Sequence, residues 1–92
     1  MKYELQYHEK VINEDIPKLS VEIRNLIKIS IEKKLLSSPE TFGKPLRKSL
    51  KGYRKLRVGD FRVIFRIENS FIKIFMIEHR SVVYRKVDKR TF

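Results

Sequence analysis

Side chains that could handle phosphate groups are concentrated between Tyr53 and Tyr84. Lysine and arginine can stabilise negative charge that develops at phosphorus, while a tyrosine, a histidine or a desolvated lysine can carry a proton. Cleavage within an RNA chain needs only these abilities, because the adjacent 2′-hydroxyl serves as the nucleophile. For His79, a lone histidine, the alternative is an ordinary structural role. The candidates for this chemistry are Lys55, Arg57, Arg62, His79, Arg80 and Tyr84.

The net charge of +11 is distributed unevenly along the chain. Residues 1–46 carry a net charge of +1, whereas residues 47–92 carry +10. Such a basic half is typical of proteins that bind a polyanion: RNA, DNA, an acidic protein or a membrane surface. Aromatic side chains among the cations favour nucleic acid, because bases stack on aromatic rings. The alternative is a solvated charged face that only keeps the protein soluble.

Length and composition limit the remaining classes of function. A chain of 92 residues predicts a single domain over residues 1–92. There is no cysteine for a disulfide, no apolar run of membrane-spanning length and no apolar segment of a secretory signal in MKYELQYHEK, so we expect a cytoplasmic protein. His8 and His79 lack metal-ligand spacing, and three glycines provide no phosphate-binding loop. We therefore expect no metal and no cofactor, and we interpret His8 as an ordinary residue between a strand and a helix.

The first half of the chain predicts one strand and two helices. Alternation indicates a strand within residues 1–7, and a helical pattern from about His8 must end or distort at Pro17, which has no donor N–H. Ser20 is the predicted N-cap of a second helix that ends near Leu36. Residues 37–52 contain two prolines and two of the three glycines and predict a long connection. The apolar stripe of the second helix consists of Ile23, Leu26, Ile27, Ile31 and Leu35.

Gly59-Asp60 sets the pairing of two strands in the second half. Glycine at the first central position is typical of a two-residue type II′ hairpin, which would place Val58 opposite Phe61 and Arg57 opposite Arg62. Opposed residues share a face of the sheet. The face toward the core would carry Leu56, Val58, Phe61, Val63 and Phe65, with Arg54 at its rim. The other face, called here the basic face, would carry Tyr53, Lys55, Arg57, Arg62, Ile64 and Arg66.

The turn at Asn69-Ser70 extends this pattern to a last strand. A two-residue loop would place Ile72, Ile74 and Met76 on the core side, whereas a three-residue loop would swap the two faces. With the two-residue loop, the basic face would gain Lys73, Phe75, Ile77 and His79. The complete order, β-α-α-β-β-β, predicts an α+β fold in which an antiparallel sheet carries two N-terminal helices on one face.

The predicted pairing places Arg57 directly across from Arg62, and like charges in that position destabilise a sheet. Solvent and salt could compensate this repulsion, and so could an acidic side chain from elsewhere in the chain. The third possibility is a bound anion, because guanidinium groups match phosphate oxygens.

Two segments, KPLRKSLKGYRKLRVGDFRVIFRI and IEHRSVVYRKV, resemble the RelE branch of the RelE/ParE toxin superfamily. The segment HEKVINEDIPKLSVEIRNLIKISIEKKL is similar to the two-helix N-terminal half of that branch. The resemblance implies the toxin of a type II toxin–antitoxin system, a ribosome-dependent, metal-independent endoribonuclease that cleaves mRNA and inhibits translation. It also implies three partners: a RelB-like antitoxin, the 70S ribosome and mRNA. The alternatives are a ParE-like toxin that binds gyrase and an inactive RNA-binding relative.

The resemblance also implies roles for individual residues. The catalytic residues that it implies are Lys55, Arg62, Arg80 and Tyr84. A second lysine of the family's strand has no clean match, since Tyr53 or Arg54 stands in its place. The RNA-binding residues that we predict are Lys51, Tyr53, Arg54, Arg57, Arg66, His79 and Arg85. The tail from Arg85 to Phe92 is predicted to be short and mobile, because a helix of that length is marginal by itself.

Overall fold

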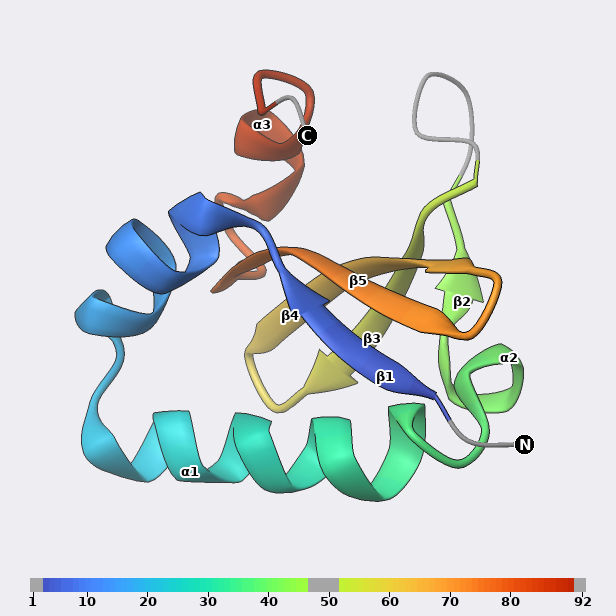
Figure 1. Ribbon diagram of the computed structural model, residues 1–92. Helices are drawn as coiled ribbons and strands as arrows, with labels where there is room; N and C mark the ends of the chain where they lie inside the picture. The colour runs from blue at the N-terminus through green and yellow to red at the C-terminus, as the bar shows by residue number, and fades with distance from the viewer. Residues whose placement is uncertain (1–2, 47–51, 91–92) are drawn as a thin grey trace.

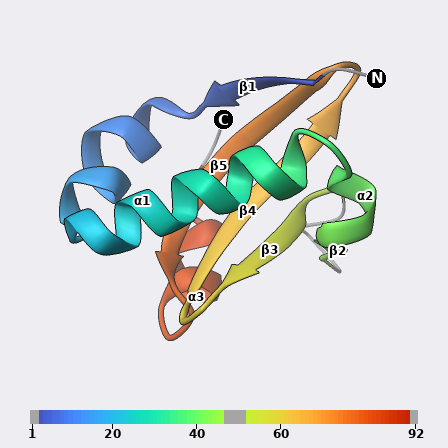
Figure 2. The same cartoon turned by 90° about the horizontal axis from the view of Figure 1, so that it is seen from below.

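The computed structural model describes residues 3–46 and 52–90, so the predicted RNA-binding residue Lys51 lies outside the described part. A five-stranded sheet lies between two helical layers, with α1 (Val21–Ser30) on one side and α3 (Val83–Val87) on the other (Figure 1). Seen from below, α1 lies across the strands (Figure 2). The α+β class predicted from the sequence is confirmed.

The sheet has the order β1-β5-β4-β3-β2. Its strands are β1 (Glu4–Tyr7), β2 (Lys44–Pro45), β3 (Arg54–Val58), β4 (Phe61–Glu68) and β5 (Phe71–His79). β1 pairs with β5 in parallel, while the other pairs are antiparallel, so the sheet is mixed rather than wholly antiparallel as predicted. Hairpin turns fix the direction of β3, β4 and β5, but no turn joins β1 to its neighbour, and local sequence therefore says nothing about its direction.

The N-terminal helical region follows the predicted outline. It comprises η1 (Val11–Asp15), η2 (Ile16–Lys18), α1, the wider turn η3 (Ile31–Leu35) and the short α2 (Pro39–Phe42). The helical path changes at Ile16-Pro17, as the missing N–H of proline requires. The Ser20 side chain accepts a hydrogen bond of 3.3 Å from the N–H of Ile23 and caps α1. Residues 37–52 are not only a connection, since they contain α2 and β2.

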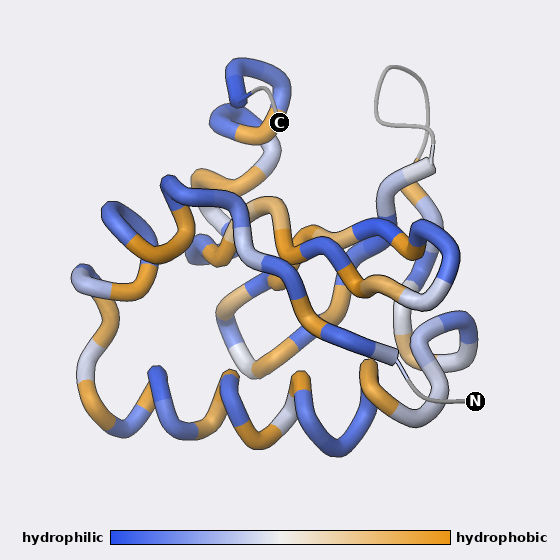
Figure 3. The backbone as a smooth tube through the Cα atoms, in the orientation of Figure 1, coloured by the Kyte–Doolittle hydropathy of each residue, from blue (hydrophilic) through white to orange (hydrophobic). Residues whose placement is uncertain are grey.

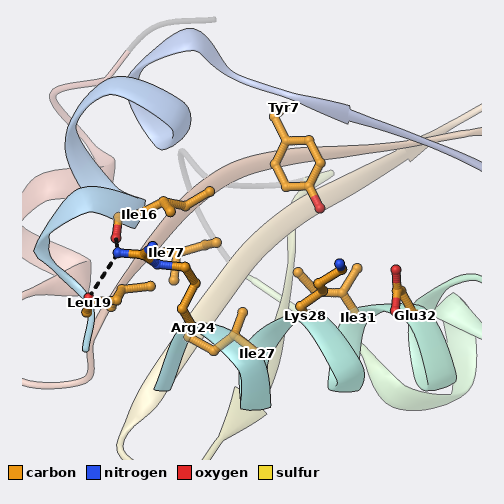
Figure 4. Close-up of a pocket in the computed structure, with 9 residues that line it drawn as sticks. All are labelled: Tyr7, Ile16, Leu19, Arg24, Ile27, Lys28, Ile31, Glu32 and Ile77. Carbon is orange, nitrogen blue, oxygen red and sulfur yellow. Dashed lines mark hydrogen bonds between the residues drawn. The ribbon is translucent and has the colours of Figure 1, made fainter. Parts of the chain in front are cut away.

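Each face of the sheet has its own hydrophobic core. Towards α1, the buried residues Ile27, Ile31 and Leu35 pack on strand residues that include Val63 and Phe65. The predicted stripe is wrong for Leu26, whose exposed fraction is 47%. Hydrophobic stretches recur along α1 and along the strands above it (Figure 3). On the opposite face, a second core consists of Ile64, Phe75, Met76, Val83 and Val87.

The β3–β4 register is the predicted one, with Val58 opposite Phe61 and Arg57 opposite Arg62. Gly59 has a φ of 58°, while Asp60 does not have a positive φ. A type II′ turn needs this combination, because only its first central residue adopts a positive φ. The hairpin therefore confirms the division into a core face and a basic face along β3 and the first half of β4.

The β4–β5 register agrees with the prediction only as far as Ile74, which pairs with Phe65. A bulge follows: Ile64 pairs with Met76, so β5 has one more residue here than β4, namely Phe75. An extra residue reverses the alternation beyond it. Met76 therefore lies on the basic face, whereas Ile77 and His79 lie on the core face, and the predicted positions of these residues are wrong.

The C-terminal segment also differs from its prediction. Of the tail predicted to be mobile, residues 85–87 belong to α3, in which Val83 and Val87 are fully buried against the sheet, while Thr91 and Phe92 lie outside the described residues. Beyond this helix, the Arg90 side chain forms an ion pair with Asp15. The sequence predicts a mobile tail because a helix of this length is marginal by itself, whereas burial of Val87 and the Arg90–Asp15 ion pair hold the segment in place.

Candidate anion-binding site

A cationic pocket of about 200 Å³ opens on the basic face. Its lining residues are Phe42, Lys44, Lys55, Arg57 and Arg62. Four of these five residues are cations and none is acidic. The pocket therefore presents a concentrated positive field in a concave site, where it attracts and orients anions most strongly.

Strand pairing brings the four cations of this pocket together. β2 places Lys44 opposite Lys55, and β4 places Arg62 opposite Arg57. Because Lys55 and Arg57 are two residues apart on β3, they project from the same face, so the two cationic pairs form adjacent rows. Charges in this arrangement repel one another, and a bound polyanion would relieve that repulsion.

Two predicted catalytic arginines meet at the Gly59-Asp60 turn. Arg62 Nη1 donates to the carbonyl oxygens of Gly59 at 2.9 Å and of Phe61 at 2.8 Å. The backbone N–H of Arg80 donates to the carbonyl oxygen of Asp60 at 2.8 Å, which brings the start of the C-terminal segment to the same turn. Arg80 Nε lies 3.7 Å from Asp60 Oδ1, and its side chain is 63% exposed. An exposed pair of this length is weak, so Arg80 can turn towards a ligand at little cost.

The other two predicted catalytic residues contact each other. Lys55 Nζ lies 5.5 Å from the centre of the Tyr84 ring, within the range of a cation–π interaction. Tyr84 is 40% exposed, although its neighbour in sequence, Val83, is fully buried. The helix α3 thus anchors one side chain in the second core and presents the next one beside the pocket.

Acidic side chains lie at the edges of the basic face. Glu68 forms ion pairs of 2.9 Å with both Arg66 and Lys73, and the hydrogen bond from Lys73 holds the pKa of Glu68 below its usual range. Glu78, which is opposite Arg62 in the ladder, pairs with Lys86 at 2.9 Å, and this hydrogen bond raises the pKa of Lys86. The Glu68 end of the face is therefore closer to neutral than the pocket.

Several predicted RNA-binding residues lie apart from the pocket. The guanidinium carbon of Arg66, Cζ, lies 5.7 Å from the centre of the Tyr53 ring. Arg54 donates to the carbonyl oxygen of Gly43 at 2.9 Å and is half-buried at the rim of the core face, as predicted. Arg85 is exposed on α3.

His79 lies on the core face, because the bulge reverses the alternation before it. Its ring contacts Phe61 edge to face at 5.5 Å, and its Nδ1 lies 2.8 Å from Ser81 Oγ. His79 Nδ1 also accepts a hydrogen bond of 3.1 Å from the Ser81 N–H. These contacts correspond to the structural alternative for His79. His8 occupies the predicted place between β1 and η1, where it is buried and its Nδ1 accepts from the Lys10 N–H at 3.0 Å.

Two lining residues of the pocket, Lys44 and Phe42, were not among the predicted site residues. Both belong to the stretch for which the sequence predicts a connection. Lys44 begins a run that extends to Arg57 and contains seven lysines and arginines and no acid. This run is the feature of the sequence that indicates a role for Lys44 in anion binding. Among the described residues, no group of three His, Cys, Asp or Glu side chains is placed to hold a metal ion.

Residues 7–84 match the family described as the ParE toxin of the type II toxin–antitoxin system, parDE. Toxin RelE of Mycobacterium tuberculosis is 42% identical over 53 residues, which is 55% of this chain and 55% of that protein. Toxin RelG of the same organism is 37% identical over 54 residues, covering 56% of this chain and 62% of that protein. The matched segment thus spans little more than half the length of these two relatives.

Solved structures share the fold. The RelBE2 toxin–antitoxin complex of Mycobacterium tuberculosis superposes with a TM-score of 0.76 at 26% identity, covering 87% of this chain and 100% of that chain. A variant of Escherichia coli toxin RelE in its free state gives 0.74 at 23% identity, with 100% of both chains covered. Because the family match covers most of the sequence, the chain belongs to the RelE/ParE superfamily of type II toxins. Toxin RelE, toxin RelG and the RelBE2 complex are the RelE-like proteins to which it is similar. This result confirms the resemblance seen in the sequence. Within the described residues, no helix is both long enough and apolar enough to cross a bilayer.

Proposed function

We propose that this protein is a toxin that inhibits translation as a ribosome-dependent, metal-independent endoribonuclease acting on mRNA. The observation that carries the proposal is the cationic pocket with Lys55 and Tyr84 in contact at its side. Arg62 lines the pocket, and Arg80 is tied to the same hairpin turn. A phosphate group and two kinds of proton-carrying side chain can therefore occupy one surface.

In the proposed reaction, the 2′-oxygen attacks the adjacent phosphorus and the bond from phosphorus to the 5′-oxygen breaks. Arg62 and Arg80 stabilise the negative charge that develops on the phosphoryl oxygens, and neither transfers a proton, because arginine stays protonated. Proton transfer falls to Lys55 and Tyr84: the 2′-hydroxyl proton leaves to the base, and the 5′-oxygen gains a proton from the acid. The products are a 2′,3′-cyclic phosphate and a free 5′-hydroxyl, so the atoms balance without water or metal.

Dependence on the ribosome follows from how open the site is. Arg80 and Tyr84 are both substantially exposed, and the pocket is small compared with a segment of RNA. Such a surface excludes little water and offers few contacts for holding a flexible strand in line for attack. We propose that the ribosome supplies this positioning by holding mRNA in one conformation, and that the basic face binds the ribosomal RNA around it.

We propose that a RelB-like antitoxin is a further partner and that the protein acts in the cytoplasm. Solved relatives include RelB–RelE complexes from Mycobacterium tuberculosis and Methanococcus jannaschii. A net charge of +11 favours an acidic partner that covers the basic face.

The test is a purified translation system with a defined mRNA, in which 5′ ends are mapped after incubation with or without ribosomes. We expect cuts only when ribosomes are present, and Arg62→Ala should reduce the cleavage rate by about 100-fold or more. Lys33→Ala is the matched control, because Lys33 is exposed on η3, on the far side of the sheet. Normal cleavage by Arg62→Ala would refute the site assignment.

The second candidate function is a ParE-like toxin that binds gyrase, and the family description that matches residues 7–84 favours it. The two functions predict opposite results in paired assays. Intact mRNA together with inhibited DNA supercoiling would establish the gyrase function. Intact mRNA with normal supercoiling, together with salt-dependent binding to RNA, would identify an inactive RNA-binding relative.

A further inference from the structure

A buried ion pair joins the two ends of the chain. Arg90 Nη1 lies 2.7 Å from Asp15 Oδ2, and Arg90 Nη2 lies 3.0 Å from Asp15 Oδ1, so the contact is two-pronged. The Asp15 side chain is 1% exposed and that of Arg90 is 8% exposed. A buried pair is costly to desolvate and persists only where its remaining hydrogen-bonding atoms are also satisfied.

Both side chains of this pair also bond the backbone of β5. The N–H of Ile77 donates to Asp15 Oδ2 at 3.0 Å, and Arg90 Nη1 donates to the carbonyl oxygen of Phe75 at 3.0 Å. β1 accompanies β5 only as far as the pair Tyr7–Ile74. Beyond that point, the edge of β5 has no neighbouring strand on this side. The Asp15 carboxylate takes the place of the missing backbone acceptor, and the Arg90 guanidinium takes the place of the missing backbone donor.

The position of α3 depends on such tertiary contacts. The helix has five residues, and its N-cap residue, Val82, makes no side-chain capping bond. An isolated helix of this length is unstable. Val83 and Val87 fix its apolar side, and the Lys86–Glu78 pair adds a contact in which Lys86 is half-exposed and screened by solvent. Arg90 fixes the segment just after the helix.

Tyr84 contacts Lys55 only because α3 lies in this place. The ring projects from α3, and Lys55 belongs to β3 on the sheet below. A small rotation of so short a helix would move the Tyr84 hydroxyl by several ångströms relative to the pocket, and catalytic groups lose most of their effect when displaced by about 1 Å.

We propose that Asp15 and Arg90 are positioning residues that hold α3 on the sheet, so that Tyr84 stays in contact with Lys55 at the side of the pocket. Neither residue is among the lining residues of the pocket, and neither needs to contact the RNA. The effect on kcat rests on the proposed endoribonuclease function. The placement of Tyr84 beside Lys55 does not depend on that function. The other possibility is a pair that contributes to folding alone.

The decisive variant is the double substitution Asp15→Asn with Arg90→Met. It removes both charges together, so no isolated charge stays buried, and the asparagine oxygen can still accept from the Ile77 N–H. Lys89→Met is the matched control. Lys89 is exposed, and this substitution removes a positive charge from the residue just before Arg90. The first measurement is the nuclear Overhauser effect between the Tyr84 ring and the Lys55 ε-protons.

We expect the nuclear Overhauser effect between Tyr84 and Lys55 in the wild type and in Lys89→Met, and we expect its loss in the double variant. The second measurement is cleavage on ribosomes. The double variant should lose kcat to about the same degree as Tyr84→Phe, with an unchanged KM for ribosomes, because the basic face is intact. A folded double variant that keeps the Tyr84–Lys55 signal overturns the proposal. A double variant that loses the signal but keeps its full kcat supports the positioning of α3 and overturns its catalytic consequence.

If the double variant fails to fold, Arg90→Lys alone decides, since lysine keeps a positive charge beside Asp15 but cannot form the two-pronged contact; a weaker signal and a lower kcat support the proposal, while unchanged values of both overturn it. If the wild type itself does not cleave mRNA on ribosomes, the proposed function fails, and the Tyr84–Lys55 signal still tests the positioning role by itself.

Discussion

Replacing Arg57 with glutamine should make the protein more stable and a weaker RNA binder. Arg57 stands directly opposite Arg62, and both line a pocket without any acid. Removing one of two opposed like charges should raise the free energy of unfolding by about 0.5 kcal/mol, within the range of about 0.2–1 kcal/mol for cross-strand pairs. For a domain of this size, that corresponds to a melting temperature about 2–4 °C higher.

The same substitution has a calculable effect on binding. Each cation that contacts a single-stranded phosphate contributes about −0.7 to the slope of log K against log salt. Contacts from Lys44, Lys55, Arg57 and Arg62 would together give about −2.8, and Arg57→Gln should reduce this to about −2.1. At 0.1 M salt the lost contact corresponds to about fivefold weaker binding.

The assay for Arg57→Gln combines two measurements. Urea unfolding gives the stability. Fluorescence anisotropy with a 2′-deoxy-substituted RNA, which cannot be cleaved, gives the affinity between 50 and 300 mM salt, over which the Debye length falls from about 14 Å to about 6 Å. Lys33→Gln, on the other side of the sheet, should change neither quantity measurably. A loss of stability combined with an unchanged salt slope would refute the view that opposed arginines are kept for binding a polyanion.

Three further predictions concern other parts of the structure. Arg80→Ala should lower the cleavage rate on ribosomes by about 100-fold with an unchanged melting temperature, because its side chain is 63% exposed; a normal rate would remove Arg80 from the site. Ile64→Ala should lower the free energy of unfolding by about 2–5 kcal/mol in urea titrations, because Ile64 is fully buried beneath α3; a loss below about 0.5 kcal/mol would show that this core is not packed as described. Lys73 lowers the pKa of Glu68, so the stability from their pair is present above the unfolded pKa of about 4.3 and is lost as the pH falls through the lower folded pKa. Urea midpoints between pH 6 and pH 3 should therefore fall less in Glu68→Gln than in the wild type, and parallel curves would contradict the pairing.

The β3–β4 hairpin shows how far local sequence can determine structure. A glycine at the first central position of a two-residue turn fixes the pairing, and the alternation of side chains then assigns every residue of both strands to a face. The row with Arg57 and Arg62 follows directly from these two rules, and the structure confirms it. The N-cap at Ser20 and the break at Pro17 are equally local, since each depends on one side chain and its own backbone.

Predictions fail where contacts between distant segments decide the structure. The bulge at Phe75 has no signature in the residues of β5 itself, and it places His79 on the core face and Glu78 opposite Arg62. In the structure, the bulged stretch lies against Asp15 and Arg90, which are far from it in sequence. The residues of β5 by themselves therefore predict a regular alternation.

The sequence by itself determined the basic second half, the α+β order of elements, the hairpin register and the family resemblance. All of these depend on composition or on residues close together in the chain. Only the tertiary structure decided that β1 runs parallel to β5, that Lys44 joins the pocket, and that α3 forms and holds Tyr84 against Lys55. The physical reason is the same in each case, because a short strand or helix gains too little energy locally to form alone and takes its place from the surfaces that it buries.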